Sequence, residues 1–197
     1  MKGFLAHAGV YSCYDLLHRR CVPLGLAQLG VISPSDVARA LETASACSHV
    51  IAIAWFKTVT NAWTTSYRMH EPDKLKCLFG CDAKDSLEHY IICRLLWSVL
   101  DCAFGGNLNP NLFARVNYSA PSSRQCCLIA TAFEIYHALK IGQRALVDTA
   151  LSCRRFAPII TVAELIAADC ARKVGNLESE SDSSSTSSSS VSSDVSA

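Results

Sequence analysis

The chain is 197 residues long, half of its residues are apolar, and its formal net charge is +1. This length allows one substantial hydrophobic core, and the apolar content excludes a chain that is disordered throughout. The charge is too small to indicate nucleic-acid binding by itself. Residues 1–177, with 18 bases against 13 acids, are nevertheless mildly basic.

The eleven cysteines favour a reducing compartment. Their number is odd, their spacing is irregular, and the chain is larger and more apolar than a small secreted domain held by disulfides. Lys57, Glu134 and Glu164 interrupt the longest apolar stretches, so none reaches the roughly 18 to 20 residues that span a bilayer. We therefore expect an intracellular protein, nuclear or cytoplasmic, without a membrane partner.

Residues 1–32 predict an N-terminal segment of helical turns and loop, because prolines and glycines follow a short amphipathic piece. A long helix is then predicted from Ser33 toward Tyr67, with a kink near 58–60. Ser33 is the expected N-cap, a proline follows it, and Asp36 closes a capping box. Apolar residues recur along this stretch at helical spacing.

The next stretch has the residue types and spacing of a four-ligand zinc site, C-x3-C-x7-H-x3-C. Gly80 supplies the positive φ for a short turn between Cys77 and Cys81, and His89 and Cys93 share a helix face because they are four apart. Four protein ligands leave no position for water, so we expect a structural zinc site. In the alternative interpretation the cysteines are small buried apolar residues.

The helix that carries His89 is predicted to run from Ser86 to about Ala103. Asp85 is expected to cap its first turn, while Glu88 closes a capping box. Residues 33–104 would thus form one unit of long helix and zinc knuckle. Residues 105–122, which contain glycines, asparagines and prolines, predict a loop or linker.

Residues 123–177 predict a separate helical block. One helix would end at Gly142, a second would span 144–155, and a last helix would open near Thr161. The cysteines of this block match no metal-binding spacing and are interpreted as buried thiols. The acidic, serine-rich residues 178–197 predict a disordered tail.

Aromatic and basic residues surround the zinc unit. Trp55 and Trp63 lie eight apart, which favours packing in the core, and stacking on a nucleobase is the alternative for exposed rings such as Trp63 or Tyr67. Basic side chains near the zinc motif are candidates for phosphate contacts, although an ordinary solvated face explains them equally well. The nucleic-acid candidates are Lys57, Trp63, Arg68, Lys74, Lys76 and Lys84.

The runs 61–68, 77–81 and 85–90, together with Cys93, resemble the zinc-binding segment that follows the polymerase domain in reverse transcriptases of non-LTR retrotransposons. That family shows a tryptophan and a T-S-x-R-like run on a helix, a cysteine pair, an acidic/small/Leu-Glu-His turn and a closing cysteine. The resemblance covers about residues 55–97. It implies the four zinc ligands named above and RNA or DNA as the partner. Many members place four residues, not three, between the last histidine and cysteine.

The sequence lacks several common catalytic and phosphate-binding motifs. It contains no Asp-Asp dipeptide of the kind a polymerase uses for metal ions, no G-x-x-x-x-G-K-[ST] loop, no G-x-S-x-G and no H-E-x-x-H. We therefore expect no catalytic activity and no small-molecule substrate. The resemblance then implies a retrotransposon remnant or fragment without the polymerase domain.

Taken together, the sequence predicts a mainly α fold, in which a small Cys3His zinc knuckle packs on a long helix and is followed by a helical block and a disordered tail. The function we hypothesise is zinc-dependent binding of RNA or DNA. The alternative is a zinc-stabilised structural or protein-interaction module. A thiol enzyme is a further rival, and it would need a reactive cysteine of low pKa beside a base.

Overall fold

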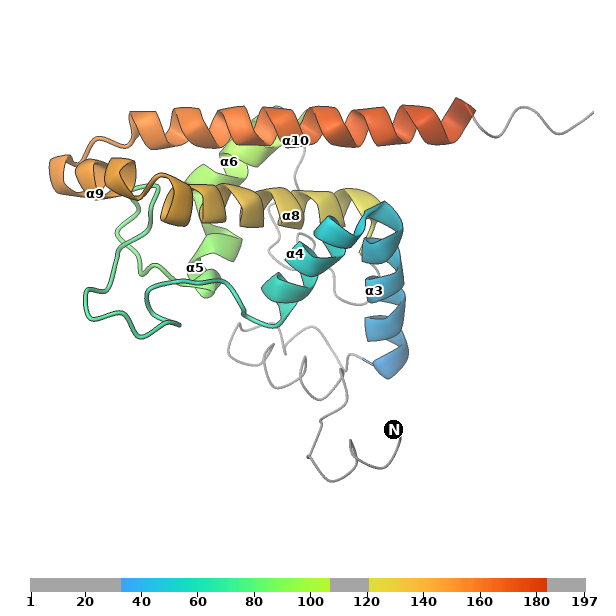
Figure 1. Cartoon of the computed structure of the whole chain (residues 1–197), viewed down its shortest axis with the longest axis horizontal. Coiled ribbons are helices and arrows are strands. Elements are labelled where there is room, and N and C mark those ends of the chain that lie inside the picture. Colours follow the sequence, from blue (N-terminus) through green and yellow to red (C-terminus); the bar gives the residue numbers. More distant parts are fainter. Residues whose placement is uncertain (1–32, 107–120, 184–197) are drawn as a thin grey trace, which may run out of the picture.

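The computed structural model describes residues 33–106 and 121–183, and every regular element within these ranges is a helix (Figure 1). This confirms the mainly α fold. The predictions for 1–32, for most of the linker and for the end of the tail lie outside the described residues. None of the helices in the two described ranges has the length and apolar character needed to cross a bilayer.

The single helix predicted from Ser33 toward Tyr67 is two helices, α3 (Pro34–Cys47) and α4 (His49–Val59). The capping box of Ser33 and Asp36 is present as predicted. The break lies at Ser48, whose extended backbone donates its N–H to Ala44 and whose hydroxyl accepts the Ile51 N–H at 3.2 Å, so that it caps α4. The chain leaves helical structure at Thr60, well before Tyr67.

The helix predicted from Ser86 to Ala103 is also divided, into α5 (Leu87–Ile92) and α6 (Arg94–Ala103). Ser86 caps α5, since its hydroxyl accepts the N–H of His89. Asp85, the predicted cap, is fully buried and has other partners, so that prediction is wrong. The break between the helices falls at Cys93, which ends α5 and precedes α6.

Within residues 121–183 there are four helical elements: α8 (Ser123–His137), the π-helical turn η3 (Ala138–Gly142), α9 (Arg144–Cys153) and α10 (Ala157–Ser183). Thr161 does not open the last helix, because α10 begins four residues earlier and the Thr161 hydroxyl donates to the Ala157 carbonyl within it. The helix continues to Ser183, so the first residues of the predicted tail are helical.

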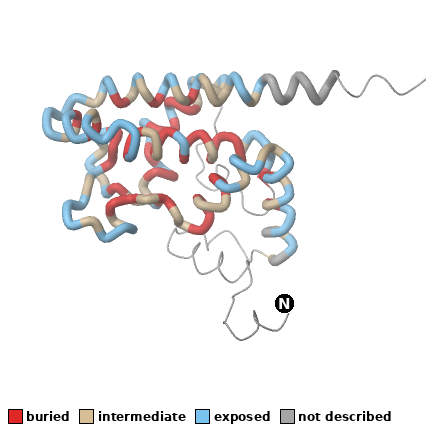
Figure 2. The backbone as a smooth tube through the Cα atoms, viewed as in Figure 1, coloured by how far each residue is buried: buried red, intermediate tan, exposed pale blue. Residues whose placement is uncertain are grey.

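Helix α8 lies at the centre of the arrangement. Helices α3, α4, α6 and α10 all contact it, and α10 runs antiparallel beside it (Figure 1). The buried apolar residues of both halves of the described chain, including Trp55, Trp63 and Trp97, form one hydrophobic core (Figure 2). The C-terminal helical block is therefore not a separate unit, and it packs directly on the segment that carries the metal motif.

Candidate metal centre

The first two candidate ligands lie on a short hairpin, residues 75–85, which we call the knuckle. Its ends are joined by hydrogen bonds from Asp85 N to Leu75 O at 3.1 Å and from Cys77 N to Ala83 O at 2.9 Å. Gly80 has a φ of +87°, as its sequence position predicts. A Cβ atom at this position would also lie 2.5 Å from the ring of Phe156, which covers the turn.

The other two ligands come from α5 and its end. His89 lies in the first turn of α5, while Cys93 lies at the junction with α6. Cys93 donates its N–H to Tyr90 O at 3.4 Å, and its carbonyl accepts the Trp97 N–H at 3.0 Å. Because its φ of −60° and ψ of 110° leave the helical region, the chain changes direction at this residue.

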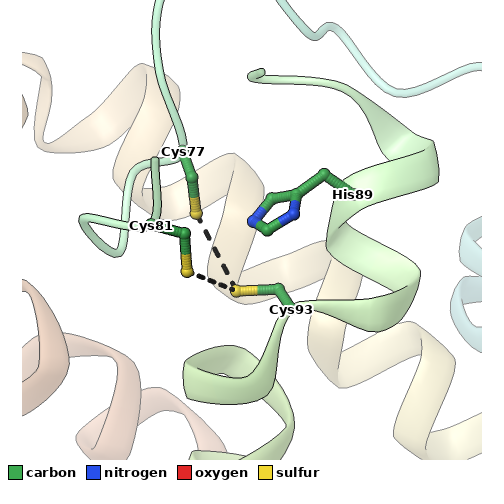
Figure 3. Close-up of side chains that lie close together, drawn as sticks. All are labelled: Cys77, Cys81, His89 and Cys93. Atoms are coloured by element: carbon green, nitrogen blue, oxygen red, sulfur yellow. Dashed lines mark hydrogen bonds between the residues drawn. The ribbon is translucent and has the colours of Figure 1, made fainter. Parts of the chain in front are cut away.

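The four side chains converge on one point, and Figure 3 shows the His89 ring directed toward the three sulfurs. Their ligand atoms all lie within 4.8 Å of one another, and the Cys93 sulfur is 3.8 Å from the sulfurs of both Cys77 and Cys81. Zn–S bonds of about 2.3 Å in a tetrahedron place two sulfurs about 3.8 Å apart, whereas a disulfide requires about 2.05 Å. The spacing therefore fits a shared metal ion.

Two further observations fit a metal ligand set. His89 Nε2 is buried without a hydrogen-bond partner, and an ion among the sulfurs would supply the missing interaction. None of the described cysteines forms a disulfide. The Cys3His group could thus bind a metal ion through all four predicted residues. No second cluster of three or more such side chains occurs within 33–106 and 121–183.

The thiols of the cluster differ in acidity. The contact with Cys77 lowers the pKa of Cys93 to about 5, and the backbone N–H of Leu96 and the nearby His89 act in the same direction. The same contact raises the pKa of Cys77, and burial raises the pKa of Cys81. A metal ion that binds all three as thiolates must therefore displace protons from the cluster.

Sequence reasoning missed a buried polar network beside the cluster. The Asp85 carboxylate is 0% exposed and accepts hydrogen bonds from Ser66 N at 2.6 Å, Tyr90 OH at 2.8 Å and Tyr136 OH at 3.2 Å. Lys140 Nζ lies 3.1 Å from it. The sequence did contain one signal of this network. Lys140 follows Tyr136 at helical spacing and so continues the apolar face of α8. A lysine on such a face is typically buried only where an acidic side chain pairs with it.

Two of the nucleic-acid candidates contact Tyr67, a half-buried residue, and a third is its neighbour in the chain. The amines of Lys74 and Lys84 lie 5.7 and 5.2 Å from the centre of its ring, within the range of cation–π contacts. Arg68 is the next residue along the chain and is exposed, with its guanidinium against the Met69 sulfur. We call these four residues, Tyr67, Arg68, Lys74 and Lys84, the Tyr67 patch.

The other three candidates are placed differently. Trp63 is 2% exposed, its indole N–H donates to Thr58 at 2.9 Å, and its ring packs against Tyr90, Phe133 and Tyr136. It is a core residue and cannot stack on a nucleobase, so that prediction is corrected. The amine of Lys57 lies over the ring of Phe133 on α8 and not over that of Tyr67. Lys76 is exposed and paired with Asp82.

Comparison with known proteins found no match, since no family model, no curated protein and no solved structure matches the chain.

Proposed function

We propose that Cys77, Cys81, His89 and Cys93 bind Zn²⁺ as a structural centre. The observation that carries the proposal is the pair of 3.8 Å sulfur separations combined with the unpartnered His89 nitrogen. Three thiolates and one imidazole in a tetrahedron are typical of zinc, whereas Mg²⁺ and Ca²⁺ prefer oxygen ligands and Cu²⁺ and Ni²⁺ prefer square-planar sites. Four protein ligands leave no open coordination position, so the proposal includes no reaction at the metal.

We further propose that the folded zinc module binds RNA or DNA through the Tyr67 patch. Two amines beside one half-buried aromatic ring, together with an exposed guanidinium on the adjacent residue, offer phosphate contacts and a ring on which a base can stack. The mildly basic composition of residues 1–177 favours the same partner. The resemblance to the zinc-binding segment of non-LTR retrotransposon reverse transcriptases supports this partner, and we propose a retroelement origin for the chain.

Salt dependence of binding tests the nucleic-acid proposal. The zinc-loaded protein would be titrated with labelled single-stranded RNA and DNA at several salt concentrations, as wild type and as Lys74→Glu/Lys84→Glu. The control, Arg172→Glu/Lys173→Glu on the exposed face of α10, changes the net charge by the same amount. We expect the patch variant to reduce the slope of log K against log salt by about 1.4, roughly 0.7 for each of the two phosphate contacts with a single strand that are lost. Equal slopes and affinities in the two variants would refute the role of the patch.

A protein-interaction module is the second candidate, and one observation favours it. An apolar groove of about 900 Å³ lies between α4, α8 and α10, and the exposed side chains of Val50, Ile53 and Leu165 line it. Exposed apolar surface of this kind is typical of docking sites. Stoichiometric zinc without any salt-sensitive nucleic-acid binding would favour this candidate over the first.

A further inference from the structure

One buried carboxylate lies in the sequence between the two ligand pairs. Asp85 lies four residues after Cys81 and four residues before His89, and it is completely buried. Its two oxygens accept hydrogen bonds from Ser66 N, from the hydroxyls of Tyr90 and Tyr136, and from Lys140 Nζ. Asp85 therefore connects the knuckle to α8 and η3 through side chains alone.

Tyr90 connects this carboxylate to the metal ligands. Its hydroxyl donates to Asp85 at 2.8 Å and accepts the N–H of Leu78 at 3.2 Å, directly beside Cys77. Its backbone carbonyl accepts the N–H of Cys93, and the preceding residue is the ligand His89. One side chain thus fixes the distance between the hairpin ligands and the helical ligands, and Asp85 fixes that side chain.

The charge of Asp85 is balanced from a distant part of the chain. Lys140 is 7% exposed, and its amine lies 3.1 Å from Asp85 and 3.1 Å from Glu71. It belongs to η3, 47 residues after Cys93. A π-helical turn inserts one extra residue into a helix and is frequent at functional sites. Here it carries the buried cation, and a buried carboxylate without a cation is strongly disfavoured.

We propose that Lys140 is a positioning residue of the metal centre, which holds Asp85 in place and, through Tyr90, sets the geometry between the knuckle and α5. The proposal rests on zinc binding by the Cys3His group. Outer-shell partners of metal ligands typically change metal affinity by about 10- to 100-fold when they are removed. We expect an effect of this size from Lys140, although its amine touches no ligand.

The test is competition for Zn²⁺ between the full chain and a chromophoric chelator. Lys140→Met should weaken zinc binding at least tenfold, while Lys140→Arg should recover part of the loss. Lys173→Met is the matched control, because Lys173 also pairs with an aspartate, Asp169, but on the exposed face of α10. Its zinc affinity should equal that of wild type. The visible absorption of bound Co²⁺ should also change in Lys140→Met, which a loss of stability alone would not produce.

The outcomes separate this inference from the proposed function. A wild-type chain that binds no zinc refutes the zinc proposal itself, and the inference with it. Wild-type zinc binding with unchanged affinity and Co²⁺ absorption in Lys140→Met refutes the inference alone. Should Lys140→Met fail to fold with zinc, the neutral pair Asp85→Asn/Lys140→Met carries the test. It leaves no fully buried charge unpaired, since Glu71 is partly exposed, and it should still bind zinc at least tenfold more weakly. Wild-type affinity would contradict the role of the ion pair.

Discussion

Single residues set the shape of the candidate metal centre, and Gly80 is the clearest case. Its φ of +87° belongs to a region that other residues rarely adopt, and its Cα faces the ring of Phe156. The glycine thus serves both the turn between Cys77 and Cys81 and the contact with the segment that joins α9 to α10. A larger residue would disturb the turn and this contact together.

We expect Gly80→Ala to lower the free energy of unfolding by about 1 to 3 kcal/mol and to weaken zinc binding. Gly105→Ala is the control, because Gly105 has a φ of +84° but no described atom lies within 4 Å of the place that the added methyl group would take. It should cost only about 1 kcal/mol. Chemical unfolding of the zinc-loaded variants measures both values. An equal cost for the two substitutions would contradict the role assigned to Phe156.

His137 is expected to make the stability of the folded chain depend on pH. Its Nε2 atom is buried without a hydrogen-bond partner, and its ring lies 4.2 Å from that of Phe133. Burial lowers the pKa of His137 below its ordinary 6.5, and the charge of Lys57 acts in the same direction, with only Glu134 opposing. The folded protein therefore binds this proton less readily than the unfolded chain, and stability falls as pH decreases through 6.5.

We expect this part of the pH dependence to disappear in His137→Phe. The difference in unfolding free energy between wild type and variant should be constant above a pH of about 7.5 and should shift in favour of the variant as pH falls to about 5.5. Urea unfolding with saturating zinc across this range measures it. Parallel curves for the two proteins would contradict the assignment.

At the scale of elements, capping residues decide where helices begin. Ser122 caps α8, the helix that contacts α3, α4, α6 and α10. Its hydroxyl accepts the Gln125 N–H at 3.2 Å, and the Gln125 side chain accepts the Ser122 N–H at 2.8 Å. This capping box satisfies two backbone groups that the helix itself leaves free.

Ser122→Ala should lower the free energy of unfolding by about 1 kcal/mol. The neighbouring Ser123→Ala is the control, since Ser123 is exposed and occupies the first helical position, one residue beyond the cap. Its effect should stay within about 0.5 kcal/mol. Denaturant midpoints at constant m-value give the comparison, and equal losses would show that the cap is not what Ser122 contributes.

The breaks in the helices are the part of these elements that periodicity cannot predict. Apolar spacing continues through Ser48, yet the backbone turns there so that both α3 and α4 pack on α8. Spacing also continues through Cys93, where the turn directs the sulfur toward Cys77 and Cys81. In both cases tertiary contacts override a local signal. The capping box of Ser33, by contrast, is local, and its prediction is confirmed.

At the scale of the whole molecule, the two halves share one core. The motif that brings Cys77, Cys81, His89 and Cys93 together is readable from the sequence, because its spacing and turn chemistry are local. The aromatic partners that bury Trp63 are not, since Tyr136 and Phe133 come from α8. The same holds for Asp85, whose cation Lys140 lies 55 residues further along the chain.

This arrangement makes the Cys3His group part of the core. The core cluster contains Cys77 and Cys93 together with residues of α4, α6, α8 and α10. Loss of the metal would leave thiols and an imidazole nitrogen buried without a common partner, and such groups are costly to bury. Zinc is therefore expected to act as a folding element for the whole molecule, not only for the knuckle.

Zinc stoichiometry is the measurement that tests this account most directly. Elemental analysis of the purified chain should give about one zinc per molecule, and Cys81→Ser and His89→Ala should each lose the metal together with much of the helical circular dichroism. Lys76→Met, which removes an exposed ion pair on the same knuckle, should keep both. Absence of zinc from the wild type, with unchanged helicity in the two ligand variants, would contradict the central claim that the Cys3His group organises the fold.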